Sequence, residues 1–174
     1  MTDPEEQITA AIDGILENIA RLKDDSHYLS RDGRNASAFV LAAIALEEVG
    51  KIIRERWDAM GLKSTRHDRT AHLQKQWAVA CLLVVESIYD DLKREALAGE
   101  PDVEAVARKF VEAKSSQFLA SVMEKRLDRA KQLGLYWDSE NAEAGRSPKH
   151  LTREGVEYLH GQMVAALALM HNRH

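Results

Sequence analysis

Near the start of the chain, apolar residues recur at helical spacing. Ile8, Ile12, Ile15, Ile19 and Leu22 follow one another at steps of four, three, four and three, which is the spacing of a single buried helix face. The Asp-Pro-Glu-Glu sequence just before them has the residues of a helix start: an N-cap aspartate, a proline at the first helical position and a glutamate two residues later. We therefore predict a helix that runs to about residue 29 and packs through one face.

The second predicted helix, from about Asn35 to Met60, has a first half that is apolar on every side. Residues 36–46 are interrupted only by Ser37, and Gly61 follows the last helical position. A helix without a polar face must be buried on several sides. We expect this helix to occupy the centre of the fold.

Three further helices are predicted from apolar runs and stop signals. One contains the apolar run 77–85 and ends at about residue 97, and the next extends from Asp102 to about Leu133. The last follows Thr152 and reaches about residue 171. Between them, residues 135–150 lack helical periodicity and are predicted to form a non-helical loop.

These elements predict an all-α fold, since no stretch alternates as a half-buried strand would. Only three prolines and nine glycines occur in 174 residues, which favours long helices over many tight turns. We expect one domain over residues 1–174, built as an up-and-down bundle of about five helices. The lone Cys81 lies in an apolar run and is expected in the core.

The apolar runs also bear on location. Both long runs are shorter than the roughly 18 residues that indicate a membrane span. The first residues are acidic and lack the basic start and apolar stretch of a secretory signal. The sequence therefore predicts a cytoplasmic protein that does not contact the membrane.

Charge is spread unevenly along the chain. The formal net charge is −4, which argues against a protein that coats nucleic acid indiscriminately. Between residues 51 and 75, however, seven basic residues outnumber three acidic ones: Lys51, Arg54, Arg56, Lys63, Arg66, Arg69 and Lys75 against Glu55, Asp58 and Asp68. This segment is either a phosphate-binding patch or a solvated helix end and loop.

Two carboxylates, Glu47 and Glu48, directly follow the apolar first half of the second helix. A buried carboxylate needs a partner, and Lys51 lies four residues after Glu47 and three after Glu48 on the same helix surface. The group is either part of a functional site or a salt-bridged helix edge.

His72 and Lys75 lie three positions apart at the start of the third helix, hence on one face. A histidine near Arg66 and Arg69 could move protons on RNA, while a cation stabilises the charge that develops on a reacting phosphate. The alternative is a histidine that only caps the helix or faces water.

Metal and cofactor sites are not predicted. Bundles that hold two metal ions repeat Glu-x-x-His on two helices, whereas Lys51 stands three residues after Glu48. Glu157–His160 and Asp24–His27 have the right spacing but lack a second carboxylate-rich helix. Neither a phosphate-cradling glycine loop nor a Gly-x-Ser-x-Gly turn occurs.

Several motifs, taken in order, resemble AbiV, an abortive-infection family of phage-resistance proteins grouped with the HEPN helical domains. These motifs are Gly-Arg-Asn-Ala at 33–36, Glu-Glu-Val-Gly-Lys at 47–51, His-x-x-Lys at 72–75 and Lys-Gln-Leu-Gly-Leu-Tyr-Trp-Asp at 131–138, followed by Ser147-Pro148 and Thr152. The resemblance covers roughly residues 14–163. It implies a helical bundle, frequent dimerisation and a role in stopping phage growth.

Many HEPN proteins are metal-independent ribonucleases that use an arginine and a histidine separated by four to six residues. Arg66 and His72 have five residues between them, as do Arg21 and His27. The resemblance also implies a second mode, in which a non-catalytic dimer binds a phage or host protein and obstructs translation. Both modes stay open from the sequence.

Our first hypothesis is an effector that impairs RNA or translation. In it, His72, Arg66 and Glu47 are the catalytic candidates, with Glu47 and Lys51 orienting His72 and Arg66 contacting phosphate. We assign substrate or phosphate binding to Lys51, Lys75, Arg69, Arg34, Glu48 and Tyr136. The Tyr136 hydroxyl can donate to Glu47 or Glu48 or to a bound phosphate, and the alternative is that its ring only anchors the loop by packing. The expected partners are a second copy of the chain, RNA, and a phage or host translation protein.

Overall fold

The computed structural model describes residues 4–62, 71–97, 102–136 and 147–171, and within these ranges the chain is helical with no β-strand. The all-α prediction is confirmed. The elements are α1 (Pro4–Arg31), α2 (Asn35–Ala59), α3 (Ala71–Leu97), α4 (Val103–Glu112), α5 (Lys114–Met123), α6 (Arg126–Leu135), a 3-10 turn (Pro148–His150) and α8 (Arg153–His171).

Helices α1 and α2 form an antiparallel hairpin. Ile15, Ile19 and Leu22 of the predicted stripe are buried against the core. The turn between the helices contains Gly33, whose φ of 75° lies in the left-handed region that glycine adopts without strain. The predicted first helix and its buried face are therefore confirmed over the part of the stripe whose side chains are described.

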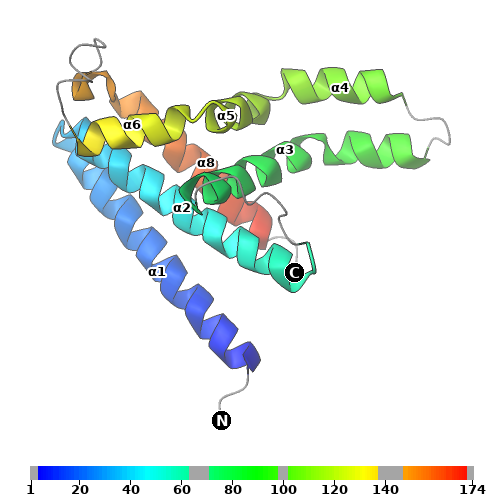
Figure 1. Ribbon diagram of the computed structural model, residues 1–174, viewed down its shortest axis with the longest axis horizontal. Helices are drawn as coiled ribbons and strands as arrows, with labels where there is room; N and C mark the ends of the chain where they lie inside the picture. The colour runs from blue at the N-terminus through cyan, green and yellow to red at the C-terminus, as the bar shows by residue number, and fades with distance from the viewer. Residues whose placement is uncertain (1–3, 63–70, 98–101, 137–146, 172–174) are drawn as a thin grey trace.

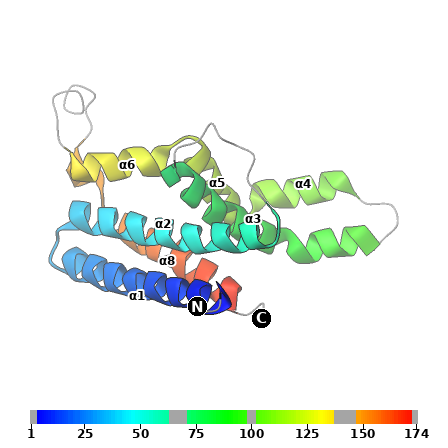
Figure 2. The ribbon, with the colours of Figure 1, turned by 60° about the horizontal axis from the view of Figure 1, so that its bottom comes forward.

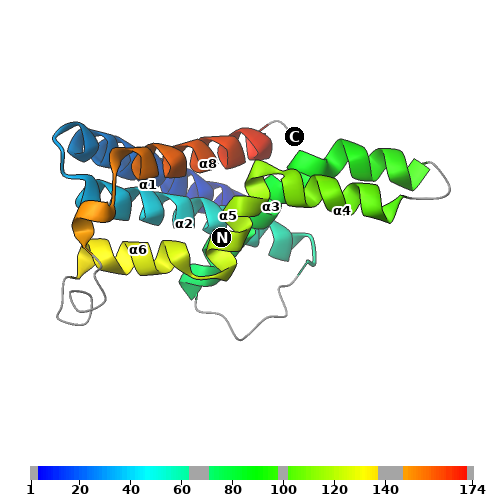
Figure 3. The ribbon, with the colours of Figure 1, turned by 90° about the horizontal axis from the view of Figure 1, so that it is seen from above.

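Helix α2 is the centre of the fold, as its apolar first half predicted. Its residues from Ala38 to Leu46 are mostly buried, and it contacts α1, α3, α6 and α8. In Figures 2 and 3, α1 and α8 lie on one side of α2 and α6 lies on the other. A polar side chain in the buried part of this helix therefore faces a neighbouring helix.

The second half of α3 leaves the bundle. Together with α4 it forms a two-helix arm that projects well beyond the other helices (Figure 1). Several large apolar residues on this arm are exposed, including Val85, Tyr89 and Leu92 of α3 and Val111 of α4. The first half of α3, in contrast, packs on α2 and carries the predicted His72 and Lys75.

The single helix predicted from Asp102 to about Leu133 is wrong, because the chain breaks there into α4, α5 and α6. Ala113 is extended (φ −62°, ψ 130°), and Lys125 is left-handed (φ 57°). The first break lets α5 pack on α3, and the second turns α6 onto α2. Tertiary packing thus overrides a helical propensity that runs through both junctions without glycine or proline.

The last helix follows the prediction closely. Thr152 Oγ1 accepts a hydrogen bond from Gly155 N at 3.3 Å just before the first turn of α8. The loop predicted at residues 135–150 is partly helical at both ends. α6 continues through Leu135, and Pro148–His150 form a 3-10 turn. Residues 137–146 of that loop lie outside the described residues.

Two further observations concern apolar segments. Cys81 is partly exposed and is not among the residues of the buried core, so the expectation that it lies in the core is not met. Among the helices that the structure describes, none combines the length and the hydropathy needed to traverse a lipid bilayer.

Candidate functional site

The candidate site lies where α3 crosses α2 at close range. A Cβ atom added to Gly50 would lie 2.0 Å from the carbonyl oxygen of Lys75 and 2.6 Å from its carbonyl carbon. The two backbones can therefore touch only because residue 50 has no side chain. This contact brings the first turns of α3 beside Glu47, which lies one turn before Gly50 on α2.

Glu47 is the central residue of the site and accepts hydrogen bonds from side chains of two other helices. Its Oε1 accepts hydrogen bonds from Lys131 Nζ of α6 at 2.5 Å and from Gln76 Nε2 of α3 at 2.8 Å. Its Oε2 lies 2.6 Å from His72 Nδ1. One carboxylate thus ties together α2, α3 and α6.

The network is buried everywhere except at His72. The side chains of Glu47 and Lys131 are each 4% exposed, and Gln76 is fully buried. The His72 side chain, in contrast, is 58% exposed. The imidazole therefore links an internal charge pair to solvent.

The pKa of Glu47 reflects two opposing effects. Burial by itself raises the pKa of this carboxyl, but the hydrogen bonds from Lys131, His72 and Gln76 outweigh it, so the pKa lies below the ordinary value of 4.5. Glu47 is therefore ionised at neutral pH, and a carboxylate can only accept hydrogen bonds.

The ionised carboxylate fixes the state of its neighbours. His72 must carry a proton on Nδ1 to donate to Oε2, which in the neutral ring leaves the Nε2 lone pair free. Gln76 must turn its NH₂ group toward Oε1, and its own Oε1 is then buried without a hydrogen-bond partner among the described residues. That unmet acceptor costs free energy, so the Glu47 contact decides how this amide is oriented.

Glu48 makes a separate ion pair. Its Oε1 lies 3.5 Å from Lys75 Nζ, and both side chains are largely buried. The prediction that His72 and Lys75 share one face is confirmed, because both reach α2 and each meets one carboxylate of the Glu-Glu pair.

The predicted pairing of Glu47 with Lys51 is wrong. Lys51 makes no hydrogen bond or ion pair with any residue that the structure describes, whereas Lys131 occupies Oε1 of Glu47. The reason is the position of α6, which packs against the side of α2 that carries Glu47. Lys51 is left as a partly exposed cation one turn further along α2.

Two other predicted site residues lie elsewhere. Arg34 precedes Glu47 by thirteen positions, about 20 Å along the axis of α2, and is exposed. Tyr136 ends α6, where Gly134 packs on Ala36 and Val40. It is 63% exposed.

The predicted Tyr136 contact is therefore wrong, since no hydrogen bond joins its hydroxyl to Glu47 or Glu48. Because α6 runs antiparallel to α2, its last residues are carried away from those carboxylates. Arg66 and Arg69 lie outside the described residues.

Lys131 and Gln76 were not predicted from the sequence as site residues. Both are polar positions inside otherwise buried helix faces: Lys131 follows the buried Leu127 by four residues, and Gln76 stands next to the apolar run of α3. A charged residue inside a buried stripe needs a buried counter-ion. This signal pointed to a missing partner for Glu47, but only the packing of α6 identifies it.

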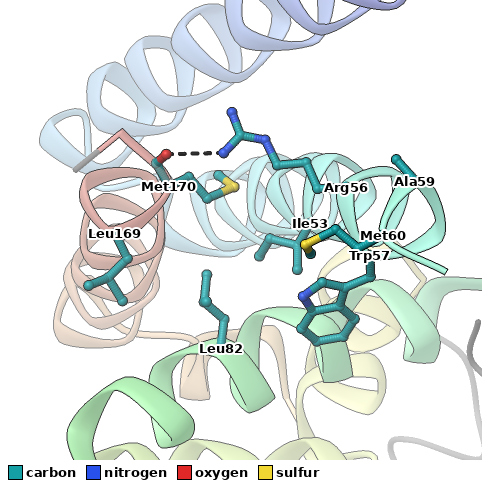
Figure 4. A pocket seen from close by; sticks show the side chains of 8 residues that line it. All are labelled: Ile53, Arg56, Trp57, Ala59, Met60, Leu82, Leu169 and Met170. Carbon is teal, nitrogen blue, oxygen red and sulfur yellow. Dashed lines mark hydrogen bonds between the residues drawn. The ribbon is translucent and has the colours of Figure 1, made fainter. Parts of the chain in front are cut away.

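A concave feature separate from the Glu47 network lies at the C-terminal end of α2. A groove of about 540 Å³ is bordered by the last turns of α2, by Leu82 of α3 and by the end of α8 (Figure 4). Arg56 crosses its rim and donates to the carbonyl oxygen of Met170 at 3.0 Å. Its other walls are mainly apolar, including Ile53, Trp57 and Met60, so the groove suits an apolar side chain and not a phosphate.

No group of three or more His, Cys, Asp or Glu side chains in the described part of the chain is arranged to hold a metal ion. Glu47 in particular already has three donors around its two oxygens. The group that the site offers to a substrate is the outer edge of His72, whose side chain is 58% exposed.

Comparison with known proteins gives one clear relationship. The model of the AbiV family, a HEPN-type family, matches residues 7–167, which is nearly the whole chain. Neither the curated proteins nor the solved structures gave a significant match. The match includes every residue of the Glu47 network. The chain therefore belongs to the AbiV family of HEPN-type helical proteins, and this membership indicates a role in abortive infection and phage defence.

Proposed function

We propose that this protein is an abortive-infection effector that cleaves RNA in the cytoplasm by metal-independent acid–base chemistry, with His72 as the proton acceptor. One observation supports this most strongly: a buried, ionised Glu47 holds Nδ1 of a half-exposed His72 at 2.6 Å. A carboxylate behind an imidazole fixes its tautomer and directs the other nitrogen outward, as in hydrolases that use a histidine base.

The reaction follows from that arrangement. Nε2 of His72 removes the proton from a ribose 2′-hydroxyl, and the 2′-oxygen attacks the adjacent phosphorus. The bond from phosphorus to the 5′-oxygen breaks, which leaves a 2′,3′-cyclic phosphate and, after that oxygen takes up a proton, a 5′-hydroxyl. Lys51, whose ammonium has no partner among the described residues, is suited to balance the negative charge on the phosphate oxygens.

The test uses purified protein and RNA in the presence of a metal chelator. Transfer RNA, ribosomal RNA and a messenger RNA are each incubated with wild type, His72→Ala and His150→Ala. His150 is an exposed histidine on the 3-10 turn and serves as the matched control. We expect wild type and His150→Ala to produce fragments with cyclic phosphate ends, and His72→Ala to lose at least about 100-fold in rate, the lower range for acid–base catalysis.

A second candidate function is a non-catalytic dimeric module that binds a phage or host translation component. The observation that favours it is the balance of charge at Glu47: Lys131 already neutralises this carboxylate, so a purely structural role of the network in joining three helices needs no further group. If folded wild type cleaves none of the three RNAs under any condition, this second function replaces the first.

We propose that either function is carried out by a homodimer formed through α3. Leu82, Val85, Tyr89 and Leu92 lie on one face of this helix, and the last three are 40–48% exposed. Their steps of three, four and three are symmetric, so an antiparallel second copy would set Val85 opposite Tyr89 and Leu82 opposite Leu92. Such a pairing satisfies twofold symmetry with apolar residues at each level.

The groove of Figure 4 fits the same arrangement, because Leu82 lines it. Leu92 of a second copy, opposite Leu82, would enter the groove beside Trp57. The adjoining stretches 63–70 and 172–174 consist of polar and charged residues, so they do not offer an apolar side chain to fill it. A second copy does, through the exposed arm.

Sedimentation tests this assembly. Wild type at tens of micromolar should be a dimer, and Val85→Glu should be a monomer with unchanged helix content, because twofold symmetry places the new charge in the interface twice. Glu104→Lys, which changes a charge on α4 away from this face, should stay dimeric. A monomeric wild type, or a dimer that tolerates Val85→Glu, would exclude the α3 interface.

A further inference from the structure

We infer that Lys131 is a positioning residue: it acts as the counter-ion of Glu47 and thereby leaves His72 uncharged and able to accept a proton. The inference deepens the proposed function and rests on it for the catalytic consequence alone. The claim about charge concerns the folded protein without RNA and can be tested separately.

The two carboxylate oxygens of Glu47 have different hydrogen-bond partners. Oε1 receives both buried donors, Lys131 at 2.5 Å and Gln76 at 2.8 Å, whereas Oε2 is left to His72. Lys131 and Glu47 are each 4% exposed, so water cannot take over the role of either partner. The buried charge of Glu47 is thus balanced by Lys131 inside the bundle, without a charge on His72.

The other charged groups around the site do not replace Lys131. On α2 and α3, Glu48 and Lys75 pair with each other at 3.5 Å. On α6, Asp128 lies 3.6 Å from Lys131 and, as an anion, cannot balance the charge of Glu47. Lys51 makes no hydrogen bond or ion pair with any described residue. Lys131 is therefore the one permanently charged cation among the described residues that contacts Glu47.

Without that cation, His72 would take its place. A buried carboxylate with no counter-ion favours a positive charge on the nearest titratable group, and His72 is already 2.6 Å away. The resulting imidazolium would satisfy Glu47, but it has a proton on both nitrogens and cannot act as a base. Because Lys131 balances the charge of Glu47, His72 does not have to be protonated to do so and can act as a base.

The experiment follows the imidazole of His72 by NMR as pH is varied, with His72→Ala for assignment and no RNA present. In Lys131→Met, the pH at which His72 titrates should rise by about one to three units. Lys131→Arg should leave it near the wild-type value. In Glu47→Gln/Lys131→Met the rise should disappear, because the carboxylate that causes it has been removed.

Lys131→Gln provides a second neutral variant in case Lys131→Met does not fold. It keeps a hydrogen-bond donor toward Oε1 but removes the charge, so it should also raise the titration of His72. The inference is overturned if either neutral variant, with native helix content and dispersed spectra, titrates within about 0.3 pH units of wild type.

The catalytic consequence is read from the pH dependence of RNA cleavage. Its acid limb should move upward in Lys131→Met by the same amount as the NMR titration. If no variant cleaves RNA but the NMR shift is present, the ribonuclease proposal fails and the role of Lys131 as counter-ion stands. If cleavage depends on His72 but the NMR titration of His72 does not depend on Lys131, the ribonuclease proposal stands and the role of Lys131 as counter-ion fails.

Discussion

Gly50→Ala should destabilise the protein by about 3 kcal/mol or more, at the upper end of what overpacking costs. The added Cβ would meet the backbone of Lys75 at 2.0 Å, and backbone atoms in two long packed helices cannot turn aside as a side chain can. α3 would have to move away from α2, which would also separate His72 from Glu47. Chemical denaturation monitored by circular dichroism measures the loss.

Gly161→Ala is the matched control. Gly161 lies inside α8, is exposed, and has no heavy atom within 4 Å of an added Cβ. Alanine there should stabilise the protein by about 0.5–1 kcal/mol, because a helical glycine loses more chain entropy on folding. Equal effects of the two substitutions would show that the close approach of α2 and α3 is not what residue 50 provides.

Lys131→Met should cost about 3–5 kcal/mol at a pH high enough to keep His72 uncharged, since it then leaves the buried carboxylate of Glu47 without a counter-ion. Glu47→Gln/Lys131→Met should recover most of this loss, because the double variant has no buried charge and the amide that replaces the Glu47 carboxylate can still accept from Gln76. A double variant that is as unstable as Lys131→Met would mean that the lysine stabilises the fold through its own packing and not through the ion pair.

The same network predicts how stability depends on pH. The pKa of Glu47 in the folded protein lies below 4.5, so on acidification the unfolded chain binds this proton first. The contribution of Glu47 is therefore complete above about pH 4.5 and is lost as pH falls through the folded-state value. The difference in unfolding free energy between wild type and Glu47→Gln should be largest above about pH 4.5 and should shrink as pH falls through the folded-state pKa of Glu47. A constant difference across that range would contradict the assignment.

The sequence was sufficient to predict the helices whose signals are local. The repeat from Ile15 to Leu22, the apolar first half of α2 and the Thr152 cap each depend on neighbours a few residues away, and each prediction is confirmed. The two breaks that separate α4, α5 and α6 depend on where α3 and α2 lie. No residue type at Ala113 or Lys125 marks them, so helical propensity alone joined the three helices into one.

In the candidate site, too, some residues were predictable from local signals, whereas others depend on how distant helices pack. Glu47 and His72 were predicted as a pair because an apolar run brings one to the bundle centre and a helix start brings the other. Lys131 is 84 residues from Glu47 in the chain, and no spacing rule connects them. Lys51 was chosen instead because its separation of four residues makes it a neighbour on the helix surface. The true partner comes from α6, which packs across that surface.

If the exposed nitrogen of His72 acts on RNA during infection, the RNA of phage-infected cells should carry the ends that this reaction leaves. Cells would carry wild type, His72→Ala or His150→Ala at equal protein levels, and total RNA would be sequenced from its 5′-hydroxyl ends after infection. We expect new 5′-hydroxyl ends with wild type and His150→Ala. With His72→Ala we expect none, together with loss of protection against the phage. If wild type stops phage growth while its RNA ends match those of His72→Ala, the catalytic account is contradicted.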